Sequence, residues 1–135
     1  KVMHQDGLIH CEKTVQQGKP DRKIYTMTEL GHAELLGWLH ETCKPQKVND
    51  SLLVKLYGGH LVDKTVLLLE IKQHRNQHQK ALLMMQEMER QYQQLASVER
   101  KKLALPYLTL RRGILGEQAW EIWAQEVESY LLENN

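Results

Sequence analysis

The spacing of apolar residues divides the chain into a short N-terminal part with strand-like alternation and a long remainder with helical periodicity. Leu8 to Val15 and Arg22 to Met27 carry β-branched and aromatic residues at short intervals, and the loop between them contains Gly18 and Pro20. This loop, Gln16 to Asp21, has the length and composition of a hairpin connection. We therefore expect a two-stranded ribbon that packs against other structure, because two strands alone are marginally stable.

From Thr28 onward the pattern predicts helices almost to the end of the chain. Hydroxyl and carboxyl side chains at suitable positions mark the helix starts, and proline or paired glycines mark the ends. The expected starts are Thr28, Asn49 or Asp50, and Asp63, and the expected ends are before Pro45, at Gly58-Gly59, and at or beyond Leu95. Glu29 lies in the first turn of the first helix, where a carboxylate interacts favourably with the helix dipole.

The helix that begins after Asp63 is the longest of these elements. Its apolar positions recur in alternating steps of three and four residues, but a polar stretch from Lys72 to Lys80 interrupts them. A single helix with so narrow an apolar stripe is not stable by itself in water. The pattern therefore predicts a partner helix.

The last helix is expected from about Tyr107 to Leu132, after a junction marked by Lys101-Lys102 and Pro106. Its apolar surface is wider than one stripe, which favours contact from more than one side, as in a dimer. A helix that packs only within its own chain is the alternative. Glutamates are expected on its other faces: Glu117, Glu121, Glu126, Glu128 and Glu133. The predicted dimer contacts are Leu68, Ile71, Leu82, Met85, Leu115, Trp120, Trp123 and Val127.

Composition limits the class of protein. The 135 residues are enough for one domain with a real core, and a net charge of +1 excludes a histone-like basic protein. Cys11 and Cys43 are too few and too far apart for a disulfide framework, so we expect reduced thiols in a cytoplasmic protein. No apolar run approaches the ~20 residues that span a bilayer, so no membrane partner is expected.

A search for catalytic motifs finds no phosphate loop, GxSxG, HExxH or CxxC, so we predict no enzyme and no cofactor. His74 and His78 share a helix face at the spacing of metal ligands, but their neighbours are not ligands and a solvated polar stretch is the preferred interpretation. Met84, Met85 and Met88 are better explained as core residues than as a ligand surface. We predict no metal site.

The run from Gly7 to Leu39, GLIHCEKTVQQGKPDRKIYTMTELGHAELLGWL, resembles the wing and following helix of the PadR-like transcriptional regulators. DSLLVKL, Asp50 to Leu56, is similar to a helix of that family. LTLRRGILGEQAWEIWAQEV, Leu108 to Val127, looks like the last helix of its AphA-like branch. The resemblance covers nearly the whole chain and is weakest in the middle of the long helix.

The resemblance implies a bacterial regulator of transcription, mainly α with a β-hairpin wing, that binds double-stranded operator DNA as a homodimer. Residues 1–45 would be the C-terminal part of a winged helix-turn-helix domain, and residues 46–135 a helical, coiled-coil-like dimerisation domain. Helices 63–103 and 107–132 match the dimerisation unit. By position, Lys19, Arg22 and Lys23 match the basic residues of the wing, which contact the DNA backbone. The operator and any small-molecule effector are not specified.

One departure from the family pattern concerns the N-terminus. Lys1 to Gly7 match only the last turn or two of the recognition helix, and the first two helices of the module have no counterpart here. We expect a missing N-terminal segment rather than a natural truncation, because Leu8, Ile9 and Ile24 would otherwise have little to pack against.

Two alternatives remain open. One is a helical dimerisation or adaptor module without DNA binding. The other is an effector or metal sensor that uses Trp120, Trp123 or the His74 and His78 pair.

Overall fold

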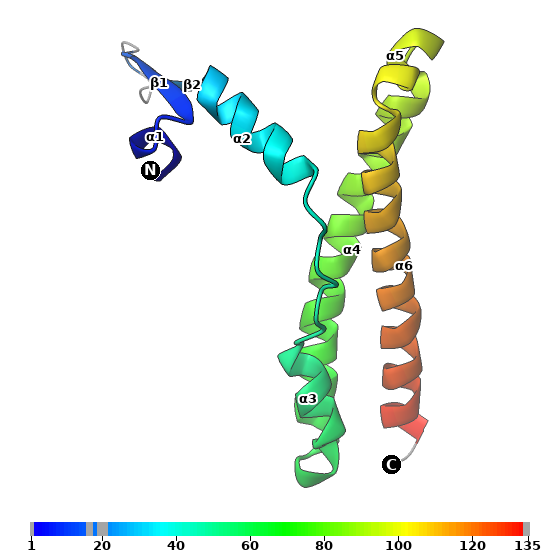
Figure 1. Ribbon diagram of the computed structural model, residues 1–135. Helices are drawn as coiled ribbons and strands as arrows, with labels where there is room; N and C mark the ends of the chain where they lie inside the picture. Colours follow the sequence, from blue (N-terminus) through cyan, green and yellow to red (C-terminus); the bar gives the residue numbers. More distant parts are fainter. Residues whose placement is uncertain (1, 16–17, 19–21, 134–135) are drawn as a thin grey trace. The chain divides into compact units, whose positions relative to one another are not determined.

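The structure, a computed structural model, describes residues 2–15, 18 and 22–133. The chain forms two compact units, residues 1–48 and 49–135 (Figure 1). The chain is mainly helical, and the first unit also contains one antiparallel hairpin, so the predicted fold class is confirmed. Among the described residues, none of the helices is both long enough and apolar enough to cross a membrane.

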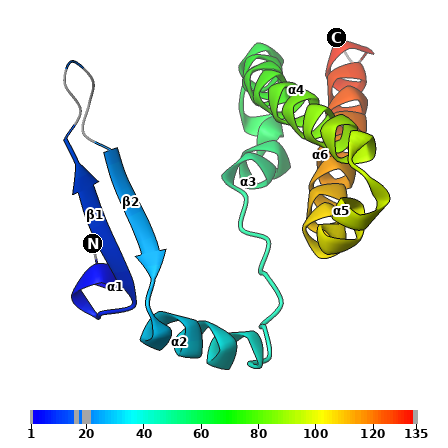
Figure 2. The same ribbon diagram turned by 90° about the horizontal axis from the view of Figure 1, so that it is seen from above.

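The first unit consists of a short helix, a hairpin and a longer helix, which Figure 2 shows in sequence. Helix α1 spans Val2–Gln5, strand β1 Ile9–Thr14, strand β2 Arg22–Met27 and helix α2 Glu29–Leu39. The strands are antiparallel. Strand β2 has the predicted bounds, and β1 is one residue shorter at each end than predicted. Gly7, at φ 71°, provides the turn between α1 and β1 in a conformation that favours glycine.

The second unit is a helical hairpin with a short helix beside it. Helix α3 spans Ser51–Tyr57, the 3-10 turn η1 Gly59–Leu61, α4 Lys64–Gln94, α5 Ser97–Lys102 and α6 Ala104–Glu133. Helices α4 and α6 lie side by side and run in opposite directions, with α5 at the turn (Figure 1). The predicted caps are confirmed, since Asp50 accepts a hydrogen bond from the Leu52 amide and Asp63 from the Thr65 amide.

Two predicted helix boundaries were wrong. A single helix over residues 63–103 is not present, because the backbone becomes extended at Leu95 and Ala96 before α5 begins. The last helix starts at Ala104 rather than Tyr107. Pro106 therefore lies in the first turn of α6, where the amide it lacks would have no partner within the helix.

The core of the second unit joins α3, α4 and α6. Leu52, Ile71 and Ala124 form its buried centre, and Trp120, Trp123 and Val127 pack against it. Ile71 is 1% exposed and Ala124 is fully buried. The partner helix that the narrow stripe of α4 requires is therefore α6 of the same chain.

Candidate nucleic-acid interface

Basic side chains gather at the loop end of the β1–β2 ribbon. The register pairs Lys13 with Lys23 and Thr14 with Arg22, the last two pairs before the loop. Arg22 and Lys23 are exposed, and neither forms an ion pair with any residue that the structure describes. Lys19, the third predicted wing residue, lies outside the described residues. The ribbon thus presents at least two cations near its tip.

These two cations face opposite sides of the ribbon, because successive side chains of a strand alternate. Lys23 shares a face with Cys11 and Tyr25, and with them it lines a shallow hollow that also includes His4 and Gln5. Arg22 lies on the other face. A ribbon with cations on both faces is suited to lie between two rows of anions rather than on one flat anionic surface.

The base of the ribbon is fixed to helix α2 by Thr28. Its hydroxyl donates to the Gly7 carbonyl at 2.7 Å and accepts from the Gly31 amide at 3.0 Å, while its amide donates to the Leu8 carbonyl at 3.1 Å. Gly31 is the buried residue of α2, and a Cβ there would overlap the Leu8 carbonyl. The N-cap of α2 therefore also sets the position of the ribbon.

A layer of charged groups crosses the α4–α6 contact of the second unit. Arg75 on α4 binds two glutamates of α6, with Nε 2.9 Å from Glu121 Oε1 and Nη1 2.5 Å from Glu128 Oε2. The three side chains are at most one-quarter exposed. The hydrogen bonds from Arg75 lower the pKa of Glu121, and they raise the pKa of Arg75. The charge of Arg75, in the polar middle of α4, is thus neutralised within the chain.

His78 extends this layer. Its Nδ1 lies 2.5 Å from Glu117 Oε2, and its ring stacks on Trp120 with 3.9 Å between centroids. His74 lies farther from the same indole, at 6.5 Å. Within residues 2–15, 18 and 22–133, no three His, Cys, Asp or Glu side chains are grouped as metal ligands would be. The spacing of the two histidines serves packing on Trp120.

The far end of the helical hairpin is fixed by a second polar cluster. Glu89 accepts hydrogen bonds from the Tyr107 hydroxyl at 2.9 Å and from Arg111 at 3.0 Å. Tyr107 stacks on Tyr92 with 4.1 Å between ring centroids. The bond to Glu89 raises the pKa of Tyr107. The α4–α6 hairpin is therefore held by two polar clusters, one in its middle and one near the turn at α5.

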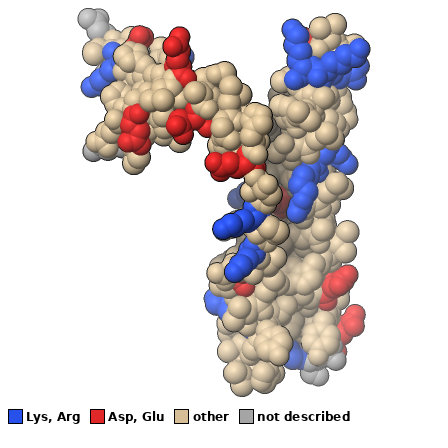
Figure 3. Space-filling model, in the orientation of Figure 1, with Lys and Arg blue, Asp and Glu red and all other residues tan. Residues whose placement is uncertain are grey.

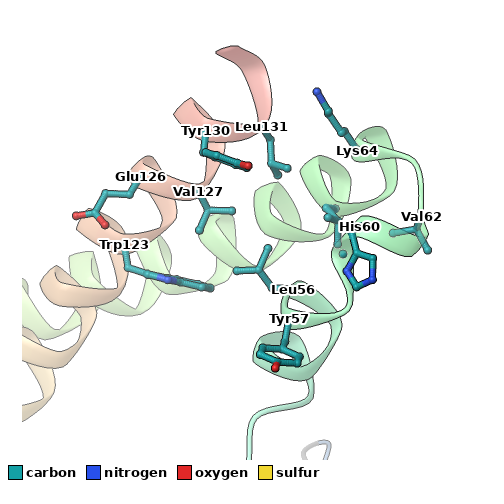
Figure 4. Close-up of a pocket in the computed structure, with 12 residues that line it drawn as sticks. Leu56, Tyr57, His60, Val62, Lys64, Trp123, Glu126, Val127, Tyr130 and Leu131 are labelled. Carbon is teal, nitrogen blue, oxygen red and sulfur yellow. The ribbon is translucent and has the colours of Figure 1, made fainter. Parts of the chain in front are cut away.

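A pocket of about 600 Å³ opens between α3, η1 and α6. Leu56, Trp123 and Val127 point toward its interior (Figure 4). Gly59 lets η1 approach α4, since a Cβ there would lie 2.7 Å from Leu67 Cδ1. Trp123 lines the pocket, whereas Trp120 contacts the histidines instead. Its lining suits the apolar body of a small molecule.

Comparison with protein families identifies the second unit. Residues 48–131 match the family described as "Virulence activator alpha C-term", which covers more than half of the 135 residues. The Vibrio cholerae virulence activator AphA has a similar structure, with a TM-score of 0.76 and 28% identity over 99% of this chain and 74% of that one. The chain belongs to the PadR-like transcriptional regulators.

Two further relatives of this PadR-like chain are also transcriptional regulators. The probable transcriptional regulator Rv1176c of Mycobacterium tuberculosis is 28% identical, over 98% of this chain and 76% of its own length. The negative transcriptional regulator PadR of Bacillus subtilis is 27% identical, over 94% of this chain and 71% of its own. The structure of that PadR with operator DNA has the same fold, with a TM-score of 0.66 and 21% identity. The match covers 96% of this chain and 73% of that one.

The residues predicted for dimer contact lie in different environments in this PadR-like chain. Ile71 is 1% exposed and packs in the core of its own chain. Trp120, Trp123 and Val127 pack against the same core, and Leu68, Leu82 and Met85 are half-buried on α4. Leu115, in contrast, is 52% exposed and lies away from that core. Leu115 is the member of the predicted set with the most surface for a partner.

Sequence reasoning misplaced two groups of side chains. Glu117, Glu121 and Glu128 were expected on outer faces of α6, but they face α4 and bind Arg75 and His78. Their spacing of four and seven residues places all three on one helix face. This spacing was the sequence feature that could have indicated a shared role. Met84 and Met88 are exposed rather than part of the core, at 68% and 52%. Met85, in contrast, is half-buried and lies against Gly113.

Proposed function

We propose that the protein is a bacterial transcriptional regulator that binds operator DNA as a homodimer through its β1–β2 wing. The observation that carries the proposal is the placement of Arg22 and Lys23 on opposite faces at the loop end of a ribbon fixed to α2. A ribbon of this kind can follow a groove while both faces meet phosphates. Lys19, in the loop, would add a third contact.

The contacts proposed for the wing are electrostatic and independent of sequence. Each phosphate neutralised by Lys or Arg releases counterions, so binding weakens as salt rises, with a slope of about −0.9 per contact in a double-logarithmic plot. Sequence preference would come from base contacts elsewhere in the dimer. The relatives support this function, because PadR of Bacillus subtilis has been crystallised with its operator.

Gel-shift titrations over a range of salt concentrations test the wing. The protein, expressed as the complete gene product, is titrated against its own promoter region. Arg22→Gln with Lys23→Gln should weaken binding and reduce the salt slope by about two, one for each lost contact. Lys80→Gln is the matched control, since Lys80 is an exposed lysine of α4. An unchanged slope in the wing variant would exclude the wing contacts, and absence of any salt-sensitive complex would favour the adaptor alternative.

A second candidate function, sensing of a small effector, is favoured by the pocket beside Trp123. A ligand there would exclude water from the indole and change its fluorescence. The emission is to be measured against a panel of apolar and aromatic small molecules, with Trp123→Phe as the control that removes the response. A panel that leaves the emission unchanged would count against sensing.

A further inference from the structure

Three basic side chains follow one another in the last turn of α5, at the turn of the α4–α6 hairpin. These residues, the basic tip, are Arg100, Lys101 and Lys102. All three are exposed, and Figure 3 shows Lys and Arg atoms gathered over this end of the second unit. From Leu95 to Leu105 the sequence has these three cations and one carboxylate. The tip is therefore strongly basic in a chain whose formal net charge is only +1.

The charges of the basic tip are not neutralised within the part of the chain that the structure describes. The nearby ion pairs use other residues, such as Arg111 with Glu89 and Arg90 with Glu87. The one carboxylate of α5, Glu99, accepts a hydrogen bond from a backbone amide at the start of that helix, at 3.3 Å. The three cations are therefore available to a partner outside the chain.

The end of α5 does not need these cations for its own stability. Cations near a helix C-terminus are favourable because the last carbonyl groups lack partners within the helix. In α5 these carbonyls already accept hydrogen bonds. The Leu103 amide donates to the carbonyls of Glu99 and Lys101. The Tyr92 hydroxyl donates to the Arg100 carbonyl at 3.0 Å.

The same contacts hold the tip in a fixed position on the hairpin. Tyr92, which bonds the Arg100 backbone, also stacks on Tyr107 with 4.1 Å between ring centroids. Tyr107 is in turn bonded to Glu89 of α4. The backbone that carries the cations is thus joined to both long helices. A surface that is already ordered loses less conformational entropy when a partner binds.

Exposed apolar side chains accompany the cations. Val98 is 66% exposed, and it shares a face of α5 with Lys101 and Lys102, which follow it by three and four residues. Leu105, in the first turn of α6, is 76% exposed. A partner that matches this surface has carboxylates beside apolar groups. Nucleic acid matches it less well, because its phosphates meet cations and its bases stack on aromatic rings rather than on Val and Leu.

We propose that the basic tip docks an acidic, amphipathic segment of another protein. Carboxylates of that segment pair with Arg100, Lys101 and Lys102, and its apolar side chains cover Val98 and Leu105. The inference goes beyond the proposed function, since the tip belongs to the second unit and the wing to the first. The docking itself does not depend on DNA binding. In a regulator bound to its operator, such a surface recruits a second protein.

Fluorescence anisotropy with a labelled peptide tests the surface on the complete gene product. The probe is a synthetic amphipathic helix with glutamates on one face and leucines on the other. The reference probe has glutamine in place of every glutamate. The acidic probe should bind, more weakly as salt rises, and the reference probe should bind about tenfold more weakly or less. Absence of binding by the acidic probe, or equal binding of both, would overturn the proposal.

Two charge-reversal variants locate the contact. Lys101→Glu with Lys102→Glu should reduce the affinity for the acidic probe by about tenfold or more, because two attractive pairs become repulsive. Lys72→Glu with Lys80→Glu is the matched control, since both are exposed lysines of α4 and the net charge changes equally. The control should change the affinity by less than about twofold. Equal losses in the two variants would mean that the probe responds to net charge alone, which would overturn the proposal.

Two further measurements separate the apolar part of the contact and the competing partner. Val98→Ser keeps every charge and should weaken binding of the acidic probe by about threefold through lost apolar contact. Circular dichroism confirms that all variants remain helical. The charge variants are also titrated with a duplex of the promoter region. If the tip variant loses more DNA affinity than the control, the tip is a nucleic-acid contact and the protein partner is excluded.

Discussion

Gly31 of helix α2 lies directly against the carbonyl group of Leu8, at the start of the ribbon. A Cβ at Gly31 would overlap the Leu8 oxygen and would also lie 3.1 Å from Met27 Cγ. The same Leu8 carbonyl accepts hydrogen bonds from the amide and the hydroxyl of Thr28. The absence of a side chain at Gly31 is therefore what allows α2 to hold the wing.

Gly31→Ala should release the ribbon from α2. A backbone carbonyl cannot move aside cheaply, so the ribbon should lose about 1–3 kcal/mol of protection in amide hydrogen exchange. Gly37→Ala is the control on the same helix, because a Cβ there meets nothing within 4 Å. This control should stabilise α2 by about 0.5–1 kcal/mol. Equal exchange rates in the two variants would contradict the packing role of Gly31.

Arg75→Met should destabilise the second unit at neutral pH. The substitution keeps an apolar stem but leaves Glu121 and Glu128 without their partner in a half-buried layer, at a cost of about 1–3 kcal/mol in the free energy of unfolding. Arg90→Met is the control, since Arg90 pairs with Glu87 on the exposed surface of α4. Urea unfolding followed by helicity measures both. If Arg75→Met leaves the free energy of unfolding unchanged, solvent already screens the ion pairs.

Acid should weaken the same layer. Arg75 lowers the folded-state pKa of Glu121 from the usual 4.5, so the carboxylate adds stability above that value. This contribution is lost as pH falls through the lowered folded pKa. The urea concentration at the unfolding midpoint should therefore stay constant at first and then decrease as the pH is lowered from neutral to ~3. The decrease should be smaller in Arg75→Met.

Two carboxylates outside the layer also contribute to the acid response. The first is Asp63, whose pKa is lowered mainly by its hydrogen bond with the Thr65 side chain. The second, Glu87, has a pKa of about 2, lowered mainly by its hydrogen bond from Arg90, and it belongs to the control pair. Arg90→Met therefore shows how much of the loss arises from Glu87. If Arg75→Met and the unaltered protein lose stability in parallel on acidification, the link to Glu121 is wrong.

Ile71→Ala should lower the free energy of unfolding much more than a matched substitution on the outer face of α4. Ile71 is 1% exposed at the centre of the core, so its truncation should cost about 2–4 kcal/mol in the free energy of unfolding. Leu69→Ala, at a position 61% exposed, should change it by less than about 1 kcal/mol. The comparison uses thermal unfolding of the complete gene product. Similar losses at the two positions would mean that a partner subunit covers Leu69.

The starts of α2, α3 and α4 could be predicted because they depend on local chemistry. Thr28, Asp50 and Asp63 each cap a helix by bonding an amide two or three residues ahead, and such bonds need no information from the rest of the chain. The break at Leu95 and Ala96 was not predicted, since neither residue excludes a helix. It follows from the need of α4 and α6 to turn back and pack on each other.

The sequence was less informative about which face of each helix is buried. Two stripes on α6 are apolar enough to be core, and the sequence does not state which one meets α4. Trp120 and Trp123 were predicted for a dimer and pack inside the chain, whereas Leu115 remains on the surface. The wing residues Arg22 and Lys23 were found from a motif, and their role in binding DNA stays a proposal.

The sequence by itself determined the hairpin, the helix caps at Thr28, Asp50 and Asp63, and the family, because these depend on neighbours along the chain and on short motifs. The tertiary structure decided which charges neutralise each other and which apolar stripe stays exposed. Arg75 meets Glu121 and Glu128 across 46 and 53 residues of chain, and the packing of α4 on α6 creates that meeting. Long-range pairing of this kind depends on how whole helices rotate to bury area, which no local pattern specifies.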